Sequence, residues 1–254
     1  MKKKLKNIIK KAIHSLGFDL YKLSTNSNSS LQLLKGLENF GVNLVLDVGA
    51  NTGQFAQELR SIGYGGRILS FEPLPDAYKK LIVNSSKDSL WDIHTRAAVG
   101  DFNGEIEINV AGNSVSSSVL PMLDTHSNIA KNSAYVGKFL VPIIHLDSLD
   151  KNLYQKKKYF IKIDTQGFEW KVLDGAQEIL SNAHGVLCEL SLTPLYEGQH
   201  LWLDIIDRLK ASGFKLWSIQ TGFTDPKNGR TLQMDAIFYR DNLPKDLNSI
   251  NKKD

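Results

Sequence analysis

The stretch LDVGANTGQF, residues 46–55, decides the fold. An apolar strand end is followed by an acid, by a turn that contains Gly49 and Gly53, and then by the start of a helix. Glycines in such a turn let the backbone bend tightly and approach a ligand closely. Backbone amides at the following helix N-terminus suit a carboxylate or a phosphate. The stretch therefore predicts a ligand-binding loop at the carboxyl end of a buried strand.

Short apolar runs alternate with helical segments beyond this loop. We expect strands at 43–48, 67–73, 93–99, 159–164 and 185–191, and helices at 52–61, 76–83, 168–180 and 201–211. Two further strands are expected at 105–110 and 140–146, and strands at 214–220 and 232–240 flank the turn sequence DPKNGR, which predicts a hairpin. The pattern predicts an α/β fold: a mostly parallel sheet with helices on both faces, a β insertion after the third strand and an antiparallel C-terminal hairpin.

Composition narrows the class of protein. The chain has 254 residues, is 42% hydrophobic and carries a formal charge of +4, which fits one α/β domain and does not indicate a nucleic-acid partner. Its single cysteine, Cys188, excludes an intramolecular disulfide framework and a cysteine-rich zinc site. The sequence contains no run of about 18 apolar residues, so we expect no membrane span. The basic N-terminus lacks the uninterrupted apolar core of a signal peptide, so we expect a cytoplasmic protein.

Three parts are expected along the chain: a basic amphipathic helix and polar linker at 1–30, the domain at 31–245 and a polar tail at 246–254. Between residue 2 and residue 16, the spacing of the apolar residues places them on one face of a predicted helix, and lysines occupy most of the other positions. Two interpretations remain open. The helix docks on the domain with a solvated basic face, or it lies peripherally on an anionic membrane.

Acidic residues fall at the predicted strand ends, where ligands bind in parallel sheets. Glu72 lies 25 positions after Asp47, and a carboxylate there is suited to accept hydrogen bonds from both hydroxyls of a ribose. A dinucleotide fingerprint requires G-x-G-x-x-G, but Asn51 replaces its middle glycine, and Asp47 would repel a diphosphate. S-adenosylmethionine carries positive charge and no phosphate, so we expect it as the cofactor. The predicted cofactor-binding residues are Asp47, Gly49, Asn51, Gly53, Glu72, Pro73 and Asp101.

Five segments together resemble the FkbM-type S-adenosylmethionine-dependent methyltransferases. They are LDVGANTGQF, LSFEP, AAVGD, HLDSLD and FIKIDTQGFEWKVLDGA, and the resemblance runs from about residue 40 to residue 240. It implies a seven-stranded, Rossmann-like class I methyltransferase fold with an antiparallel last strand. It also implies O-methylation of a hydroxyl, commonly on a sugar of a polysaccharide, glycolipid or related natural product. One departure is Gln166, where the family usually has glutamate, and a neutral amide cannot act as a base.

An alcohol acceptor needs a group that takes its proton. The candidates are Asp164 after the fourth main strand, Glu189 after the fifth, and His200 before a helix. Each has a structural alternative: a helix cap or a contact to the cofactor's amino group for Asp164, local backbone bonding for Glu189, and simple surface exposure for His200. Asp164 and Glu189 as oxygen ligands would allow metal assistance, but no tight carboxylate cluster supports a metal site.

Three functions compete at this stage. The leading interpretation is an O-methyltransferase that acts on a glycan or other small-molecule acceptor. The alternative is a non-catalytic S-adenosylmethionine-binding module in a glycan biosynthesis complex, which Gln166 keeps open. A nicotinamide oxidoreductase is disfavoured by Asn51, and no basic patch interleaved with aromatics supports RNA as acceptor.

Overall fold

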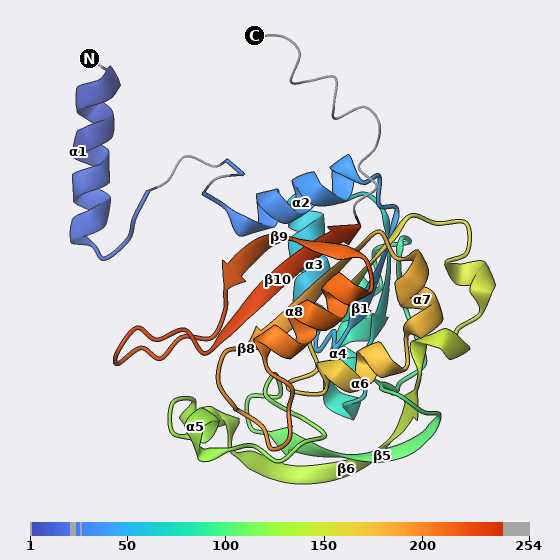
Figure 1. The fold of residues 1–254 in the computed structure, drawn as a ribbon. Helices are drawn as coiled ribbons and strands as arrows, with labels where there is room; N and C mark the ends of the chain where they lie inside the picture. The colour runs from blue at the N-terminus through green and yellow to red at the C-terminus, as the bar shows by residue number, and fades with distance from the viewer. Residues whose placement is uncertain (1, 21–23, 26, 241–254) are drawn as a thin grey trace.

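A seven-stranded sheet forms the centre of the domain in the computed structural model, which describes residues 2–20, 24–25 and 27–240 (Figure 1). The strand order is β3-β2-β1-β7-β8-β10-β9, and β10 alone runs opposite to the other strands of this sheet. The strands are β1 Leu44–Val48, β2 Arg67–Phe71, β3 Trp91–Ile93, β7 Tyr159–Ile163, β8 Gly185–Ser191, β9 Phe214–Thr221 and β10 Gln233–Arg240. The predicted mostly parallel sheet with an antiparallel C-terminal hairpin is confirmed.

Helices cover both faces of this sheet. On one face, α2, α3 and α4 pack with the core that includes Leu37, Leu59 and Leu81, whereas α6, α7 and α8 pack on the opposite face around Leu173 and Ile206. The helices of the described chain are α1 Lys2–Ser15, α2 Ser29–Asn39, α3 Gln54–Ser61, α4 Pro75–Ser85, α5 Asp124–Ser127, α6 Glu169–Asp174, α7 Gln177–Asn182 and α8 Trp202–Ala211, with 3₁₀ turns at Lys131–Ser133, Leu146–Ser148 and Lys151–Leu153. Strands β1 and β7 are buried along their whole length, as expected for parallel strands covered on both sides.

The predicted β insertion forms a sheet of its own. It has three strands in the order β4-β6-β5, with bounds β4 Ala98–Val99, β5 Gly104–Ala111 and β6 Tyr135–Ile144. This small sheet curves beneath the carboxyl edge of the main sheet (Figure 1). A third hydrophobic core around Val141, Ile143 and Phe168 joins the two sheets. The insertion therefore lies where parallel sheets bind ligands.

Two predicted elements are interrupted in the structure. The strand expected at 93–99 is divided into β3 in the main sheet and β4 in the small sheet. The helix expected at 168–180 is divided into α6 and α7 with Gly175 between them, where a side chain would meet the backbone oxygen of Gly100 at 1.9 Å.

The N-terminal part also differs in detail. The polar linker ends earlier than expected, because the side chain of Asn28 caps α2 by accepting a hydrogen bond from the amide of Leu31 at 2.8 Å. The predicted tail at 246–254 lies outside the described residues. Within the described part of the chain, no helix is long and apolar enough to cross a membrane.

Candidate active site

A cavity of about 290 Å³ runs along the carboxyl edge of the main sheet. It is lined by residues from, or directly after, β2, β1, β7, β8, β10 and β9, so it crosses most of the sheet. Strand order reverses between β1 and β7, and both strands contribute to the lining. This is the position at which open α/β sheets bind ligands.

The loop after β1 is shaped to approach other backbone closely. Gly49 has φ 77°, and a side chain there would meet the backbone oxygen of Asp164 at 1.9 Å. Gly53 has φ 90°, and a side chain there would meet the ring of Trp91 at 2.5 Å. Both positions therefore require glycine, as the sequence predicted for the first turn.

Backbone strain gathers at the same cavity. Three described residues other than glycine have positive φ: Asn51 at 48°, Ser114 at 58° and Gln166 at 55°. All three line the cavity, although they come from three distant segments of the chain. Left-handed backbone in such residues costs about 1–3 kcal/mol each and concentrates at functional sites.

Glu72 connects the ends of β1 and β2. Its Oε2 accepts a hydrogen bond from the amide of Asn51 at 2.8 Å, and its Oε1 accepts one from the amide of Leu74 at 2.9 Å. Burial raises the pKa of Glu72 to about 7, against the opposing effect of these two bonds. The carboxylate lines the cavity and has acceptor capacity left for ligand hydroxyls.

Amides of the β1 loop are already used within the chain. The amides of Gly49 and Ala50 donate to the carbonyl of Phe71, and the amide of Thr52 donates to the side chain of Asn51. The sequence suggested amides open to an anion at the N-terminus of the following helix. Gly53 caps α3 without a side-chain hydrogen bond, so this suggestion stays a prediction for the first turn of α3.

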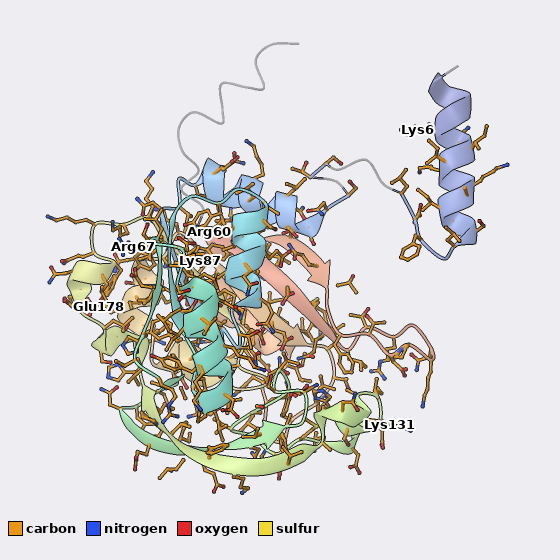
Figure 2. All side chains as sticks on the ribbon, turned by 180° about the vertical axis from the view of Figure 1, so that it is seen from behind. Lys6, Arg60, Arg67, Lys87, Lys131 and Glu178 are labelled. Carbon is orange, nitrogen blue, oxygen red and sulfur yellow. The ribbon has the colours of Figure 1, made fainter. Side chains whose placement is uncertain are left out.

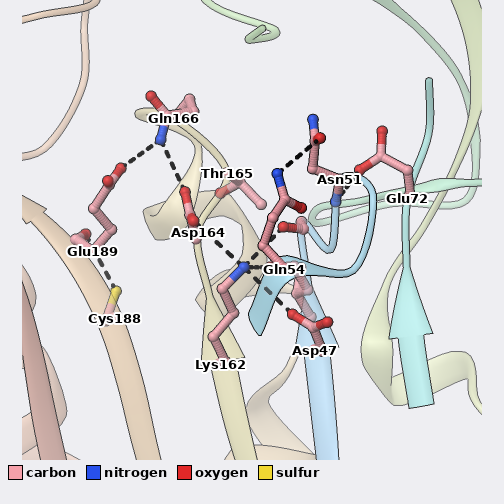
Figure 3. Close-up of polar contacts among 12 residues, drawn as sticks. Asp47, Asn51, Gln54, Glu72, Lys162, Asp164, Thr165, Gln166, Cys188 and Glu189 are labelled. Atoms are coloured by element: carbon pink, nitrogen blue, oxygen red, sulfur yellow. Dashed lines mark hydrogen bonds and ion pairs between the residues drawn. The ribbon is translucent and has the colours of Figure 1, made fainter. Parts of the chain in front are cut away.

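Lys162 is the central charge of the site and was not singled out from the sequence. Its ammonium lies 3.4 Å from Asp47 Oδ1 and 3.4 Å from Asp164 Oδ2, and it donates to the carbonyl oxygen of Gly49 at 2.8 Å (Figure 3). Burial acts to lower the pKa of Lys162, but the attraction of Asp164 and Asp47 outweighs it and holds the pKa above its usual value. The lysine ties the β1 loop to the end of β7.

Asp47 interacts with Lys162 and does not line the cavity. The residue is completely buried, its Oδ2 accepts a hydrogen bond from Ser70 at 2.9 Å, and it is not among the described residues that line the cavity. Direct contact of Asp47 with a cofactor therefore stays a prediction. In the structure, its charge is directed at Lys162.

Gln166 bridges two acidic candidates. Its Nε2 donates to Asp164 Oδ1 at 2.9 Å and to Glu189 Oε2 at 2.7 Å (Figure 3). Its Oε1 accepts from the hydroxyl of Tyr196 at 2.8 Å. Gln233 donates to the same oxygen of Glu189 at 2.7 Å. The neutral amide thus separates two carboxylates that would otherwise face each other across one small space.

Glu189 and Glu169 support the site from behind it. Burial raises the pKa of Glu189 well above its usual value, and the negative charges of Asp164 and Glu169 act in the same direction. Glu189 lies within β8 rather than after it and is not among the described cavity-lining residues. Glu169 accepts hydrogen bonds from the amides of Thr165 and Gly167 at 2.9 and 3.1 Å, so it orients the loop that carries Asp164.

Asp235 is a second residue that was not selected from the sequence. It lies on β10 opposite Glu189 of β8, and it lines the cavity. Burial raises its pKa to about 6, and the negative charge of Asp164 acts in the same direction. Within the described part of the chain, its carboxylate has neither a hydrogen bond nor an ion pair with another side chain. An alternation of polar and apolar residues in LQMDAIFYR was the available signal, but it does not show which face meets the cavity.

The inserted segment closes the opposite wall. Ser114, Ser117 and Ser118 line the cavity. The side-chain amide of Asn51 donates to Ser114 Oγ at 3.2 Å, and Ser118 Oγ donates to the backbone carbonyl of Gln166 at 2.6 Å. The structure thus brings hydroxyl groups of the inserted segment to the cavity.

Two predicted residues lie elsewhere. Asp101 forms an ion pair with Lys171 at 2.8 Å, and His200 stacks on Trp170 with ring centroids 3.9 Å apart. Neither is among the described residues that line the cavity. Gly49, Asn51, Glu72, Pro73 and Asp164 do line it, whereas Gly53 supports the loop from behind. Their roles toward a bound cofactor stay predictions.

The donor set fits a cationic adenosine compound. The cavity lining includes the carboxylates of Glu72, Asp164, Asp235 and Glu58, whose negative potential suits a cationic ligand. No group of three or more side chains among histidine, cysteine, aspartate and glutamate is arranged to hold a metal ion within the described residues.

Comparisons with known proteins agree with this site. The sequence profile of the Methyltransferase FkbM domain matches residues 47–216, which include the β1 loop, Glu72, Asp164 and Glu189. No curated protein matches the sequence.

Several solved structures match this chain at low sequence identity, with TM-scores below 0.5. Sp1610 of Streptococcus pneumoniae, a candidate tRNA (m1A22) methyltransferase in complex with S-adenosyl-L-methionine, is 12% identical over 84% of this chain and 72% of its own, with a TM-score of 0.45. The methyltransferase domain of bacterial CtHen1 is 9% identical over 85% of this chain and 100% of its own, with a TM-score of 0.46. An S-adenosylmethionine-dependent methyltransferase of Aquifex aeolicus is 12% identical over 85% and 98%, with a TM-score of 0.40.

Proposed function

Because this chain belongs to the FkbM methyltransferase family, and is thus an S-adenosylmethionine-dependent methyltransferase, we propose that it methylates a hydroxyl of a sugar. The acceptor sugar would belong to a polysaccharide, a glycolipid or a related natural product. The observation that carries this proposal is the polar lining that Asp235, Gln220 and Ser30 give to the cavity. Carboxylate, amide and hydroxyl groups are the partners that bind polyhydroxylated ligands.

The cofactor, when bound, supplies a methyl group on a positively charged sulfur. The chain's own residues then have two tasks. Glu72 and the β1 loop hold the adenosine end, and residues of β7, β9 and β10 orient the acceptor hydroxyl in the other half of the cavity. Correct placement of two reactants supplies a large share of the rate in such transfers.

A carboxylate takes the hydroxyl proton in this proposal. Asp164 lines the cavity but shares its charge with Lys162 and Gln166. Asp235 also lines the cavity, and its pKa of about 6, raised by burial, suits a base that works near neutral pH. We propose Asp235 as the base and Asp164 as the residue that positions the acceptor, while Glu189 and His200 take no direct part.

A second candidate function rests on Gln166. Where the family pattern has glutamate, this chain has an amide whose hydrogen bonds are all directed at protein groups. A non-catalytic S-adenosylmethionine-binding module in a glycan biosynthesis complex would also show this arrangement. Both candidates bind the cofactor, but only the enzyme converts it to S-adenosylhomocysteine.

The test has two arms with the full chain. Thermal unfolding with S-adenosylmethionine, S-adenosylhomocysteine and NAD should show stabilisation by the first two only, lost in Glu72→Ala. Ligand at about 100 times its dissociation constant stabilises by about 2.7 kcal/mol. Mass spectrometry then follows S-adenosylhomocysteine production with simple glycosides, bacterial oligosaccharides and RNA. Turnover with carbohydrate supports the proposal. Cofactor binding without turnover favours the binding module, and turnover with RNA alone overturns the sugar acceptor.

We propose the cytoplasm as the place of this reaction. The only cysteine, Cys188, is completely buried in β8 and burial raises the pKa of its thiol, so it serves as a small apolar core residue. Fractionation of cells that express the full chain tests the location, and recovery outside the cytoplasmic and membrane fractions would contradict it.

A further inference from the structure

The N-terminal helix α1 stands apart from the methyltransferase domain in both views of the molecule (Figures 1 and 2). Its described side chains take no part in the hydrophobic cores that join the other helices to the sheets. A helix of 14 residues is marginal in water when nothing packs against it. Stability of α1 therefore requires a surface that covers its apolar side.

The apolar side of α1 faces solvent. Ile8 is 64% exposed and Ile9 is 42% exposed, and just beyond the helix Leu16 and Phe18 are 74% and 69% exposed. At 100° per residue, Ile8, Ile9, Ile13 and Leu16 lie within one continuous stripe along the helix. Large apolar residues gathered in a stripe outside the core mark an interaction surface.

Lysines border this stripe on both sides. Lys6 and Lys10 lie along one border of the helix, and Lys11 lies along the other; Lys6 is labelled in Figure 2. Residues 2–18 include six lysines and no acid. Lysine side chains at such borders lay their apolar stems along the stripe and place the ammonium groups level with a charged surface.

We propose that α1 docks the enzyme onto an anionic lipid surface, with its apolar stripe among the acyl chains and its lysines at the phosphate level. The charge pattern selects this occupant. A lipid surface presents negative charge on both sides of a buried stripe, as the two lysine borders require. Because α1 ends at Ser15 and α2 begins at Ser29, the domain would lie beside the membrane when the helix is docked. The proposal is independent of the acceptor that the enzyme uses.

Vesicle flotation with the full chain tests the proposal. Vesicles of phosphatidylcholine alone are compared with vesicles that also contain phosphatidylglycerol, each at low and high salt. The chain should float with the anionic vesicles, should remain mostly unbound with neutral ones, and should be released by salt. Sedimentation away from both kinds of vesicle, or equal binding to both, would overturn the proposal.

Matched variants separate a built surface from general positive charge. The double variant Lys6→Glu and Lys10→Glu should bind anionic vesicles at least roughly 25-fold less, at about fivefold for each basic residue lost, and repulsion of the two added carboxylates acts in the same direction. Lys79→Glu and Lys80→Glu on α4 change the net charge equally on exposed residues of the domain and should bind as the unaltered chain does. Equal loss in both double variants would overturn the role of α1.

A third variant tests the apolar stripe. Ile9→Ser with Ile13→Ser keeps every charge and should weaken binding to anionic vesicles, whereas Asn7→Ser outside the stripe should leave it unchanged. Thermal unfolding of the domain and its stabilisation by S-adenosylhomocysteine should be the same in all these variants, because α1 lies outside the cores. Unchanged binding in the stripe variant would show purely electrostatic adsorption and would contradict insertion.

Discussion

The ammonium of Lys162 lies 3.4 Å from Oδ1 of Asp47, with both side chains buried. This Asp47 oxygen makes no hydrogen bond within the described structure, so the lysine is its compensating charge. Register explains the pair, because Asp47 of β1 is directly opposite Lys162 of β7 in the parallel sheet. The sequence suggested the negative charge of Asp47 for binding a cofactor. In the structure this charge pairs with Lys162, which holds the β1 loop.

Lys162→Met should therefore destabilise the protein strongly. It leaves the buried carboxylate of Asp47 without its counter-charge, and breaking a buried pair from one side costs about 3–5 kcal/mol. Urea unfolding of the unliganded chain measures this loss. The double variant with Asp47→Asn should recover a large part, because it removes the stranded charge. A loss of only ~1 kcal/mol in the single variant, as for screened surface pairs, would contradict the interpretation.

Binding of S-adenosylhomocysteine should strengthen as pH rises from 6 to 8. Burial raises the pKa of Glu72 to about 7, and ribose hydroxyls donate best to its ionised form. A carboxyl with pKa 7 is about tenfold more ionised at pH 8 than at pH 6, so the dissociation constant should fall by up to about tenfold. Titration calorimetry measures it. The Glu72→Gln variant should bind S-adenosylhomocysteine more weakly, and its affinity should not change with pH. If the affinity of this variant still changes with pH, another group is responsible for the titration.

Several residues that were selected from the sequence line the cavity. Gly49, Glu72 and Asp164 are each close in the chain to a strand end, and strand ends follow from local apolar patterns. The cavity does contain all three. The left-handed backbone at Asn51 was not visible, because the type of residue there does not require it.

The far side of the site depends on contacts between distant segments. Lys162 is a single charge within an apolar strand, and only its register with β1 shows that Asp47 balances it. Asp235 reaches the cavity because β10 inserts between β8 and β9, an order that no local pattern contains. His200 and Asp101 were chosen for chemical type and nearness to expected strand ends, and the structure gives both of them other partners.

Gln166→Glu should create a weak divalent-cation site. A carboxylate at this position would face Asp164 and Glu189, whose oxygens lie 2.9 and 2.7 Å from the present amide nitrogen. Loss of these bonds and repulsion between the acids should cost about 1–3 kcal/mol, and more at higher pH. Three carboxylates also form an oxygen ligand set for Ca²⁺ or Mn²⁺. Thermal unfolding with each cation and with EDTA tests this.

The cation response separates charge from lost bonding in that variant. Gln166→Ala removes the same hydrogen bonds without adding charge, so it should be destabilised but should not respond to cations. The unaltered chain should respond little. If Ca²⁺ and Mn²⁺ do not change the thermal unfolding of the Gln166→Glu variant, the prediction of a cation site is wrong. Gln166 then only separates two carboxylates and does not occupy the position of a metal ligand.

Asp235→Asn should stabilise the unliganded protein at high pH. Burial raises the pKa of Asp235 to about 6 from a model-peptide value of 3.8, so the unfolded chain loses its proton first as pH rises. Folding stability therefore falls between pH 3.8 and pH 6, and ionised Asp235 costs stability above that range. At 1.36 kcal/mol per pKa unit, reduced for partial exposure, the variant should gain roughly 1–3 kcal/mol at pH 8 and nothing below pH 4.

Unfolding of both proteins across this pH range measures the difference. Asp76→Asn is the matched control, because the side chain of Asp76 is 91% exposed on α4 and should show no such dependence. If Asp235→Asn is more stable at pH 8 and loses methyl transfer, the protein retains an unpaired carboxylate at a cost in stability because the reaction requires it. A variant less stable at pH 8 would instead show that Asp235 is held by favourable contacts, and the proton would then have to pass to Asp164.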